Sequence, residues 1–188
     1  YTMTKNRFYT FLALLTILVW GTTFVSTKTL LGYLSPIQIM FCRYIIAYLA
    51  LVMIYPKFHR TLGTKQELLC LCAALCGSTI YFLAENTALF YTQASNVSLL
   101  ISAAPILTSA VAHLFTRDEH ITRSVVYGFL VAIVGIFLVV CNGHFILRLS
   151  PAGDLLALAA ALSWAFYTVI LRKIQTDYSP VFITRRIF

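Results

Sequence analysis

Three charged side chains, Lys28, Arg43 and Glu85, interrupt long apolar stretches of this sequence. A charge inside a membrane-spanning helix is costly, so each is a functional-site hypothesis. At 1.5 Å rise per residue they fall at a similar depth on three helices. Two interpretations stay open. In one, they form an outer gate or ligand cluster, in which Glu85 takes up a proton or exchanges its cationic partner for substrate. In the other, Glu85 pairs structurally with Arg43 or Lys28.

A stripe of small polar residues follows in the next apolar stretch. Ser98, Ser102, Pro105, Ser109 and His113 are three or four residues apart, which places them on one helix face. Such a stripe indicates helix packing with cross-helix hydrogen bonds, or the lining of a cavity. Near the middle of this stretch, Pro105 leaves a backbone carbonyl free and permits a bend.

The preceding stretch shows the same spacing, with Ser78, Tyr81 and Glu85 on one face and Asn86 beside them. Trp20 and Trp164 also lie mid-stretch, away from the membrane interface where tryptophan usually sits. This pair could line a cavity for apolar or aromatic substrates, or simply pack in the core.

The composition requires that these residues be held by membrane helices. Hydrophobic residues make up 60% of the 188 residues, charged residues 11%, and mean hydropathy is +0.86. A soluble domain carries roughly 25% charged residues. Backbone groups in lipid must be satisfied within the segment, and the apolar stretches are too long for barrel strands. We therefore predict an all-α, polytopic transmembrane helix bundle, with six complete spans and a partial seventh from Pro180: 8–31, 36–55, 67–91, 94–116, 122–142 and 153–173.

The loops predict the orientation. If the spans alternate, nine cations fall on one side: Lys5, Arg7, Lys57, Arg60, Lys65, Arg117, Arg123, Arg172 and Lys173. The opposite side holds Arg148. Because cytoplasmic loops carry an excess of Lys and Arg, the amino terminus is predicted to be cytoplasmic.

An internal repeat appears when the sequence is shifted by 144 residues. Trp20 then falls on Trp164, Lys28 on Arg172, and Ser35-Pro36 on Ser179-Pro180. One period holds five spans, an odd number, so the second copy must enter the membrane from the other side. Such inverted repeats are common among secondary transporters. We expect a first repeat over 1–148 and the truncated start of a second over 149–188, as in a fragment of a longer protein.

Several motifs together resemble one known family. They are W-G-T-T-F-V-S-T-K from Trp20 to Lys28, then Pro36 and Arg43, A-L-F-Y-T-Q-A-S-N-V-S-L-L-I-S-A-A-P from Ala88 to Pro105, and Glu119, Thr122, Gly128 and Gly135. In this order and spacing they look like one EamA-type repeat of the drug/metabolite transporter superfamily. The resemblance implies ten helices in two inverted halves, a substrate cavity between them, and movement of small metabolites, often export of amino acids from bacteria.

We therefore expect a secondary transporter in the cytoplasmic (inner) membrane that works by alternating access. A non-transporting membrane scaffold or subunit and a channel-like pore remain the alternatives. The candidate cavity or gate residues are Trp20, Lys28, Arg43, Tyr81, Glu85, Asn86, Ser102, Pro105 and Trp164.

Other chemistries find no support in the sequence. There is no phosphate-binding G-x-x-x-x-G-K-[ST] loop, no nucleophile–base constellation and no zinc-ligand spacing. All five cysteines lie in apolar stretches, where cysteine behaves as a small hydrophobe. We expect no enzyme activity, no cofactor and no metal. The expected partners are a small-molecule solute and the lipid bilayer, with no nucleic acid despite the charge of +8. The sequence leaves the oligomeric state open, and a monomer is one option for the full-length protein.

Overall fold

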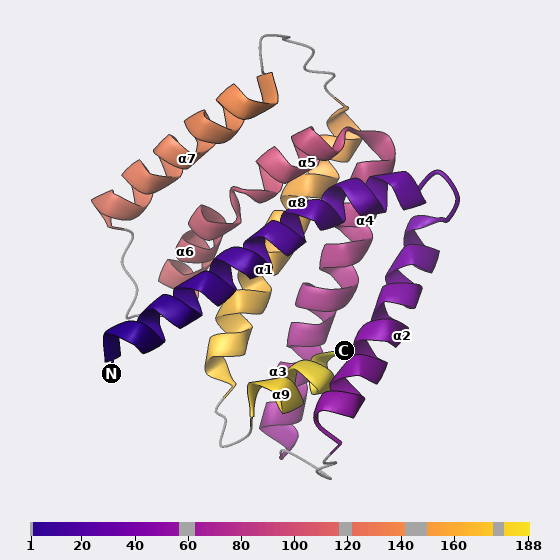
Figure 1. Ribbon diagram of the computed structural model, residues 1–188, viewed down its shortest axis with the longest axis vertical. Coiled ribbons are helices and arrows are strands. Elements are labelled where there is room, and N and C mark those ends of the chain that lie inside the picture. Colours follow the sequence, from indigo (N-terminus) through magenta and orange to yellow (C-terminus); the bar gives the residue numbers. More distant parts are fainter. Residues whose placement is uncertain (1, 57–62, 117–121, 142–149, 175–178) are drawn as a thin grey trace.

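The computed structural model describes residues 2–56, 63–116, 122–141, 150–174 and 179–188, and most of these residues lie in helices (Figure 1). Within these ranges there is no strand. The predicted all-helical class is thus confirmed. Five helical stretches are long and apolar enough to cross a membrane: Arg7–Leu30, Pro36–Ile54, Thr64–Tyr91, Ala94–Phe115 and Pro151–Lys173.

The first two helices form an antiparallel hairpin. Helix α1 (Thr2–Leu30) lies at the edge of the bundle, and α2 (Pro36–Ile54) begins directly after a tight turn. The cap of α2 is well satisfied, because Ser35 Oγ accepts from Gln38 N at 3.4 Å and Gln38 Oε1 accepts from Ser35 N at 2.8 Å. Pro36 occupies the first turn, where its missing N–H costs nothing.

The third predicted span is continuous but not uniform. It consists of α3 (Thr64–Ala74), a π-helical segment η1 (Leu75–Ile80) and α4 (Tyr81–Tyr91). π-helical turns inside α-helices are rare and often occur at functional sites. This one directly precedes Tyr81 and Glu85.

The fourth predicted span is broken. Helix α5 (Ala94–Ile101) ends two residues before α6 (Ala104–Phe115) begins, and Pro105 lies in the first turn of α6. Because Pro105 has no N–H, it cannot donate to the carbonyl of Ile101. The bend predicted at Pro105 is therefore present as a full break.

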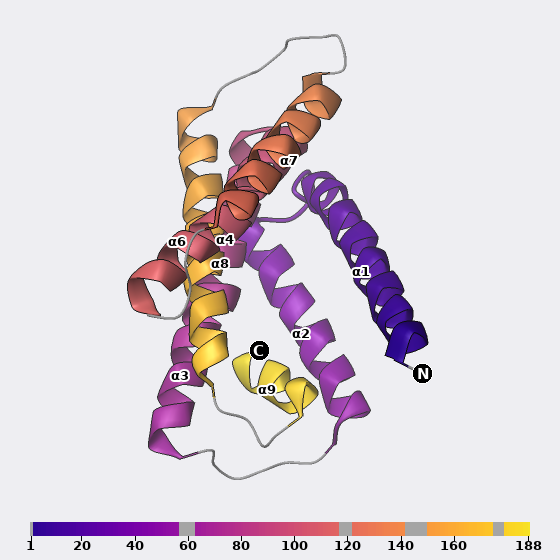
Figure 2. The same cartoon turned by 90° about the vertical axis from the view of Figure 1, so that its left-hand side faces the viewer.

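Helix α8 (Pro151–Lys173) is the central helix of the structure, and it packs against α3, η1, α4, α5 and α6 (Figures 1 and 2). The fifth predicted span corresponds to α7 (Arg123–Cys141), which lies beside α5 and α6. The chain ends in the short helix α9 (Pro180–Ile187), packed between α2 and α3.

Small residues let α8 approach its neighbours closely. Gly153, Ala157, Ala161 and Ala165, spaced four residues apart, are all buried. Gly77 in η1 is also required for packing, since a Cβ there would meet the ring of Tyr167 at 2.3 Å.

The segment predicted to begin a second copy of the repeat shares local geometry with the first. Ser179 caps α9 as Ser35 caps α2, with its Oγ accepting from Phe182 N at 3.3 Å and a proline following. Helices α1 and α8 run in opposite senses along the long axis of the molecule (Figures 1 and 2).

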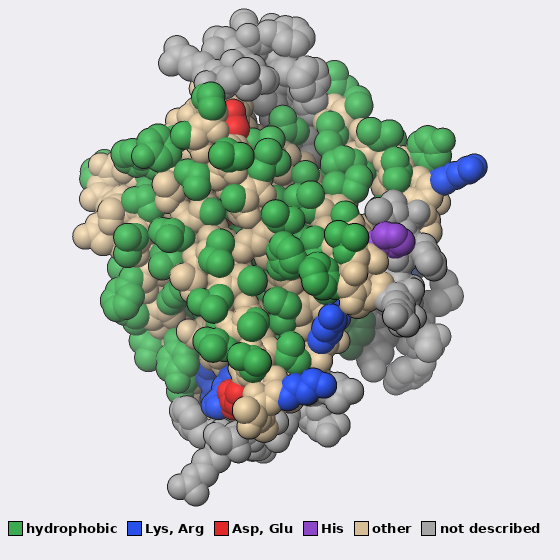
Figure 3. All heavy atoms as spheres, turned by 180° about the vertical axis from the view of Figure 1, so that it is seen from behind, with side chains coloured by type: hydrophobic (Ala, Val, Ile, Leu, Met, Phe, Trp, Pro, Cys, Tyr) green, Lys and Arg blue, Asp and Glu red, His purple; other side chains and the backbone are tan. Residues whose placement is uncertain are grey.

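The outer surface of the bundle is largely apolar. Large hydrophobic side chains of α1, α2, α7 and α8 are exposed, and none of the most apolar part of α1 is buried. On the face in Figure 3 hydrophobic side chains cover the broad middle, while the visible charged side chains lie toward its margins. An apolar surface of this extent suits lipid rather than water.

Candidate functional site

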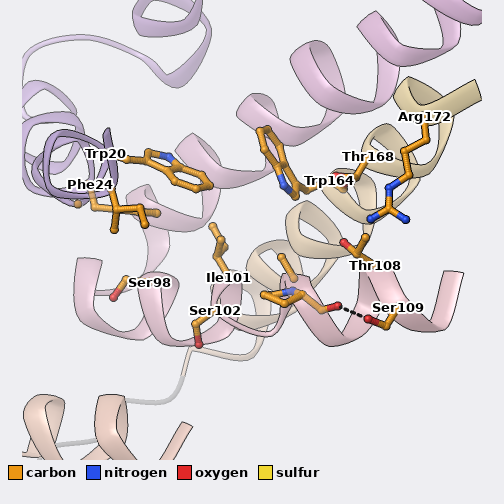
Figure 4. Close-up of a pocket in the computed structure, with 14 residues that line it drawn as sticks. Trp20, Phe24, Ser98, Ile101, Ser102, Thr108, Ser109, Trp164, Thr168 and Arg172 are labelled. Carbon is orange, nitrogen blue, oxygen red and sulfur yellow. Dashed lines mark hydrogen bonds between the residues drawn. The ribbon is translucent and has the colours of Figure 1, made fainter. Parts of the chain in front are cut away.

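A cavity of about 830 Å³ opens between α1, α5, α6 and α8 (Figure 4). Four predicted residues line it, namely Trp20, Ser102, Pro105 and Trp164. The rest of its wall is formed by Ile17, Gly21, Phe24, Ser98, Ile101, Ala104, Thr108, Ser109, Thr168 and Arg172. The volume lies within the usual range for small-molecule sites.

The two repeat-related tryptophans meet at this cavity. Their ring centroids are 5.6 Å apart with the planes inclined by 41°, although 144 residues separate them in sequence. Figure 4 shows the indoles facing one space from α1 and α8. The sequence left open whether they line a cavity or pack in the core; in the structure both line the cavity, and Trp164 also packs against the core. Aromatic faces of this kind bind apolar or planar groups.

The serine stripe lies on the cavity wall opposite the indoles. Each hydroxyl donates to a carbonyl of its own helix: Ser102 Oγ to Leu99 O at 2.6 Å, and Ser109 Oγ to Pro105 O at 3.0 Å. Thr168 does the same from α8, donating to Trp164 O at 2.9 Å. Since the hydroxyl protons are used within the helices, their oxygens offer lone pairs as acceptors.

Arg172 lines the end of the cavity away from Phe24 (Figure 4). From the sequence, Arg172 was interpreted as a topology signal and as the repeat counterpart of Lys28, not as a cavity residue. The spacing in the sequence could have indicated its place in the cavity wall, because Trp164, Thr168 and Arg172 are four residues apart and share one face of α8. His113, at the end of the serine stripe, is exposed on α6 and does not line the cavity.

A second polar cluster lies behind the cavity, between α2 and α4. Glu85 is 1% exposed, and Arg43 of α2 lies close enough to interact with it electrostatically. The guanidinium carbon of Arg43 lies 4.7 Å from the ring centroid of Phe82. Tyr44 and Ser78 complete the cluster, although the sequence analysis did not place Tyr44 among the candidates.

The cluster contains several unsatisfied groups. Glu85 Oε2, Tyr81 OH and Arg43 Nη1 are buried without a hydrogen-bond partner, as is Asn86 Oδ1. The other end of the Asn86 amide is used, because Nδ2 donates to Pro36 O at 3.2 Å. Asn86 thereby ties α4 to the start of α2.

Tyr81 connects the cluster with the cavity. Its side chain is fully buried, and its ring centroid lies 4.9 Å from that of Phe82 and 4.9 Å from that of Trp164. Tyr81 therefore packs behind a cavity-lining indole, one helical turn before Glu85.

Lys28 lies apart from Glu85. Its Nζ donates to two carbonyl oxygens at the end of α4, those of Leu89 and, at 2.7 Å, Thr92. A cation there satisfies carbonyls that the end of a helix leaves without partners and matches its dipole. Of the three charged residues predicted at a similar depth, the structure thus brings together Arg43 and Glu85 and uses Lys28 as a helix cap.

Charged contacts also hold the end of the chain. Arg185 is buried and donates to Tyr55 O, while Arg186 of α9 pairs with Glu67 of α3. The hydrogen bonds that Arg186 donates to Glu67 raise the pKa of Arg186 above its ordinary value. These contacts lie outside the cavity.

Helices that cross the membrane, a break in one of them and an internal cavity define a multi-pass membrane protein of the transporter type. The particular family follows from comparison with known proteins. Residues 7–141 match the EamA-like transporter family, which is most of the chain, and the protein belongs to this family.

Individual relatives agree with this assignment. The chain is 31% identical over 178 residues to a probable amino-acid metabolite efflux pump of Salmonella typhimurium, and 28% identical over 170 residues to the uncharacterized transporter YvbV of Bacillus subtilis. An uncharacterized transporter of Archaeoglobus fulgidus is 29% identical over 179 residues. These alignments cover 90%, 90% and 93% of this chain but only 55%, 55% and 61% of the relatives. The chain thus spans little more than half the length of these relatives. No solved structure matches it at a significant level.

Proposed function

We propose that the intact protein is a secondary carrier that exports amino acids or related small metabolites by alternating access. The observation that carries the proposal is the cavity of about 830 Å³ at the meeting point of Trp20 and Trp164, one from each copy of the repeat. A site between two inverted copies is where rocking of one half against the other opens it to each side in turn.

The cavity wall suits a zwitterion with an apolar or planar side chain. Arg172 supplies guanidinium donors for a carboxylate, and the hydroxyl oxygens of Ser102, Ser109 and Thr168 supply acceptors for an ammonium group. The indoles of Trp20 and Trp164 supply apolar faces for the remainder. The name of the Salmonella relative, a probable amino-acid metabolite efflux pump, supports the same substrate class.

The arrangement in the membrane completes the proposal. Residues 1–148 form the first five-helix repeat, and the second, inverted copy begins after them. Its support is the repeated serine cap before α2 and α9 and the opposite senses of α1 and α8. The excess of Lys and Arg in alternate predicted loops supports a cytoplasmic amino terminus, with the protein in the cytoplasmic membrane.

Counterflow in liposomes tests the proposal. The intact protein is reconstituted with a high internal concentration of one amino acid at a time, and uptake of the same labelled amino acid at trace concentration is followed. A carrier gives a transient overshoot, whereas a channel-like pore gives only equilibration. If no amino acid of the panel is taken up above the level of empty liposomes, the scaffold interpretation is favoured and the proposal is refuted.

A variant of the cavity wall and a matched control outside the cavity test the role of Arg172. Arg172→Gln keeps a polar side chain but removes the charge, and we expect the half-saturating concentration of a transported amino acid to rise by at least tenfold. Arg123→Gln, at the exposed start of α7, removes the same charge away from the cavity and leaves counterflow unchanged. Equal transport by the two variants would remove Arg172 from substrate binding.

A further inference from the structure

We propose that Glu85 is a proton-binding site, with Arg43 as its counter-ion, and that its occupancy is transmitted to the cavity through Tyr81 and Trp164. The proposal rests on the proposed transport function for its role, although proton binding itself is independent of substrate. It concerns the cluster of Glu85, Arg43 and Tyr81 behind the cavity, and none of these three residues lines the cavity.

The position of Glu85 is the first reason. Among the acidic residues that the structure describes, Glu67 and Asp154 lie in the first turns of α3 and α8, and Glu85 alone lies well inside a membrane-spanning stretch, in α4. A carboxyl group that is 1% exposed there cannot keep an isolated negative charge without a large energetic cost. Such a group must be neutralised, either by a bound proton or by a cation.

The state of Arg43 is the second reason. In a structural ion pair, a guanidinium holds a carboxylate through two parallel hydrogen bonds. Here, within the described residues, no ion pair joins the two side chains, and the guanidinium lies over Phe82 instead. Arg43 Nη1 and Glu85 Oε2 are both buried and unpartnered. The two groups are near one another but not locked together.

The remaining groups of the cluster accommodate both forms of Glu85. When the proton is bound, the carboxyl O–H can donate to an acceptor, and Tyr81 OH and Asn86 Oδ1 are buried nearby without partners. When the proton has left, the carboxylate can accept from Arg43 Nη1. The step is a simple transfer: a proton from water adds to a carboxylate oxygen and later returns to water, and no other bond is formed or broken.

The groups of the cluster itself are Arg43 and Tyr44 of α2, Ser78 of η1, and Tyr81 and Asn86 of α4. The helices packed against α2 and α4 also carry Lys28 of α1, Asn96 of α5, Tyr167 of α8 and Arg185 of α9. The cations other than Arg43 hold backbone carbonyls: Lys28 at the end of α4, and Arg185 at Tyr55. Arg43 is therefore the cation available to Glu85.

A packed aromatic path joins the proton site to the cavity. Tyr81 lies one turn before Glu85, and its ring contacts Trp164, whose own ring faces Trp20 across the cavity. The π-helical segment η1 ends immediately before Tyr81. A change of hydrogen bonding at Tyr81 OH on protonation of Glu85 thus acts on the ring that supports the cavity wall.

Infrared difference spectroscopy tests the proton site without any substrate. The intact protein in nanodiscs is titrated from pH 5 to pH 9, and the carbonyl stretch of a protonated, buried carboxyl group is followed. We expect a titrating band in the wild type and in Glu67→Gln, which removes the half-buried carboxylate paired with Arg186, and no such band in Glu85→Gln. A band that persists in Glu85→Gln, or its absence from the wild type, would overturn the proposal. If Glu85→Gln cannot be purified, Glu85→Asp is used instead. We then expect the band to remain but the pH midpoint of its titration to differ from that of the wild type. An unchanged midpoint would count against Glu85 as the proton site.

Transport then tests the coupling. An amino acid that gives counterflow in the wild type is used to measure accumulation driven by a pH gradient. We expect Glu85→Gln to keep counterflow, which needs no net proton movement. Its accumulation driven by the pH gradient should fall at least tenfold below that of the wild type. Wild-type accumulation in Glu85→Gln would refute the coupling. If no amino acid gives counterflow in the wild type, the transport proposal fails, and the infrared titration still decides the proton site.

Discussion

Replacement of Gly77 by alanine tests the closest helix contact in the structure. Gly77 lies in η1, and a Cβ built there would come within 2.3 Å of Tyr167 Cδ2, 2.4 Å of Cγ and 2.8 Å of Cε2. Because these atoms belong to a rigid ring rather than to the end of a flexible chain, α8 or the tyrosine must move. Overpacking of this kind costs about 1–3 kcal/mol, and we expect Gly77→Ala to lower the free energy of unfolding by that amount.

The matched control is the same substitution where there is room. Gly128 lies inside α7 with nothing within 4 Å of its Cβ position. There alanine reduces the freedom of the unfolded chain and is expected to be neutral or to stabilise by about 0.4–1 kcal/mol. Reversible unfolding by sodium dodecyl sulfate in bicelles gives both free energies on the same scale.

A double-mutant cycle locates the cause. With Tyr167 replaced by alanine the obstructing ring is gone, so Gly77→Ala should cost nothing further, and the coupling energy should equal about 1–3 kcal/mol. If Gly77→Ala is as stable as the wild type, or if its penalty is unchanged by Tyr167→Ala, the contact between η1 and α8 does not have the geometry described above.

Three further predictions concern the cavity, a helix cap and the topology. Trp164→Ala removes a ring that faces Trp20 and should raise the half-saturating amino-acid concentration in counterflow by about 2- to 10-fold, whereas Trp164→Phe keeps most of the contact. Lys28→Met leaves two carbonyl oxygens at the end of α4 without their donor and should lower the unfolding free energy by about 1–3 kcal/mol, an effect that Lys28→Arg should avoid. Cysteines placed at exposed Lys65 and Tyr33 should react with an impermeant maleimide from opposite sides of the membrane, and labelling of both from one side would contradict the alternation of spans.

The membrane class and the positions of the spans were predictable because they depend on local sequence. Length and hydropathy of a stretch decide whether it crosses lipid, whatever the rest of the chain does. The bend at Pro105 was predictable for the same reason, since a missing N–H acts within one turn. The π-helical segment η1 was not, because its apolar sequence reads as ordinary helix and its close packing on α8 involves Tyr167, far away in the chain.

The candidate site was predictable only in part. Trp20 and Trp164 were recognised because the repeat aligns them, and the structure brings their rings together. Arg172 was missed as a cavity residue, and Lys28, its partner in the alignment, caps α4 instead. The two cations occupy equivalent places in the repeat, yet their surroundings differ because each faces different helices.

The sequence alone thus determined that the chain is a membrane helix bundle and which residue types are unusual in lipid, and it predicted an internal repeat. Only the tertiary structure decided which of those residues meet: the tryptophans at a cavity, Glu85 beside Arg43, and Lys28 at the end of a helix. The physical reason is that hydropathy and backbone constraints act over a few residues. The rotation of each helix about its axis is set instead by the fit of side chains that are distant in sequence.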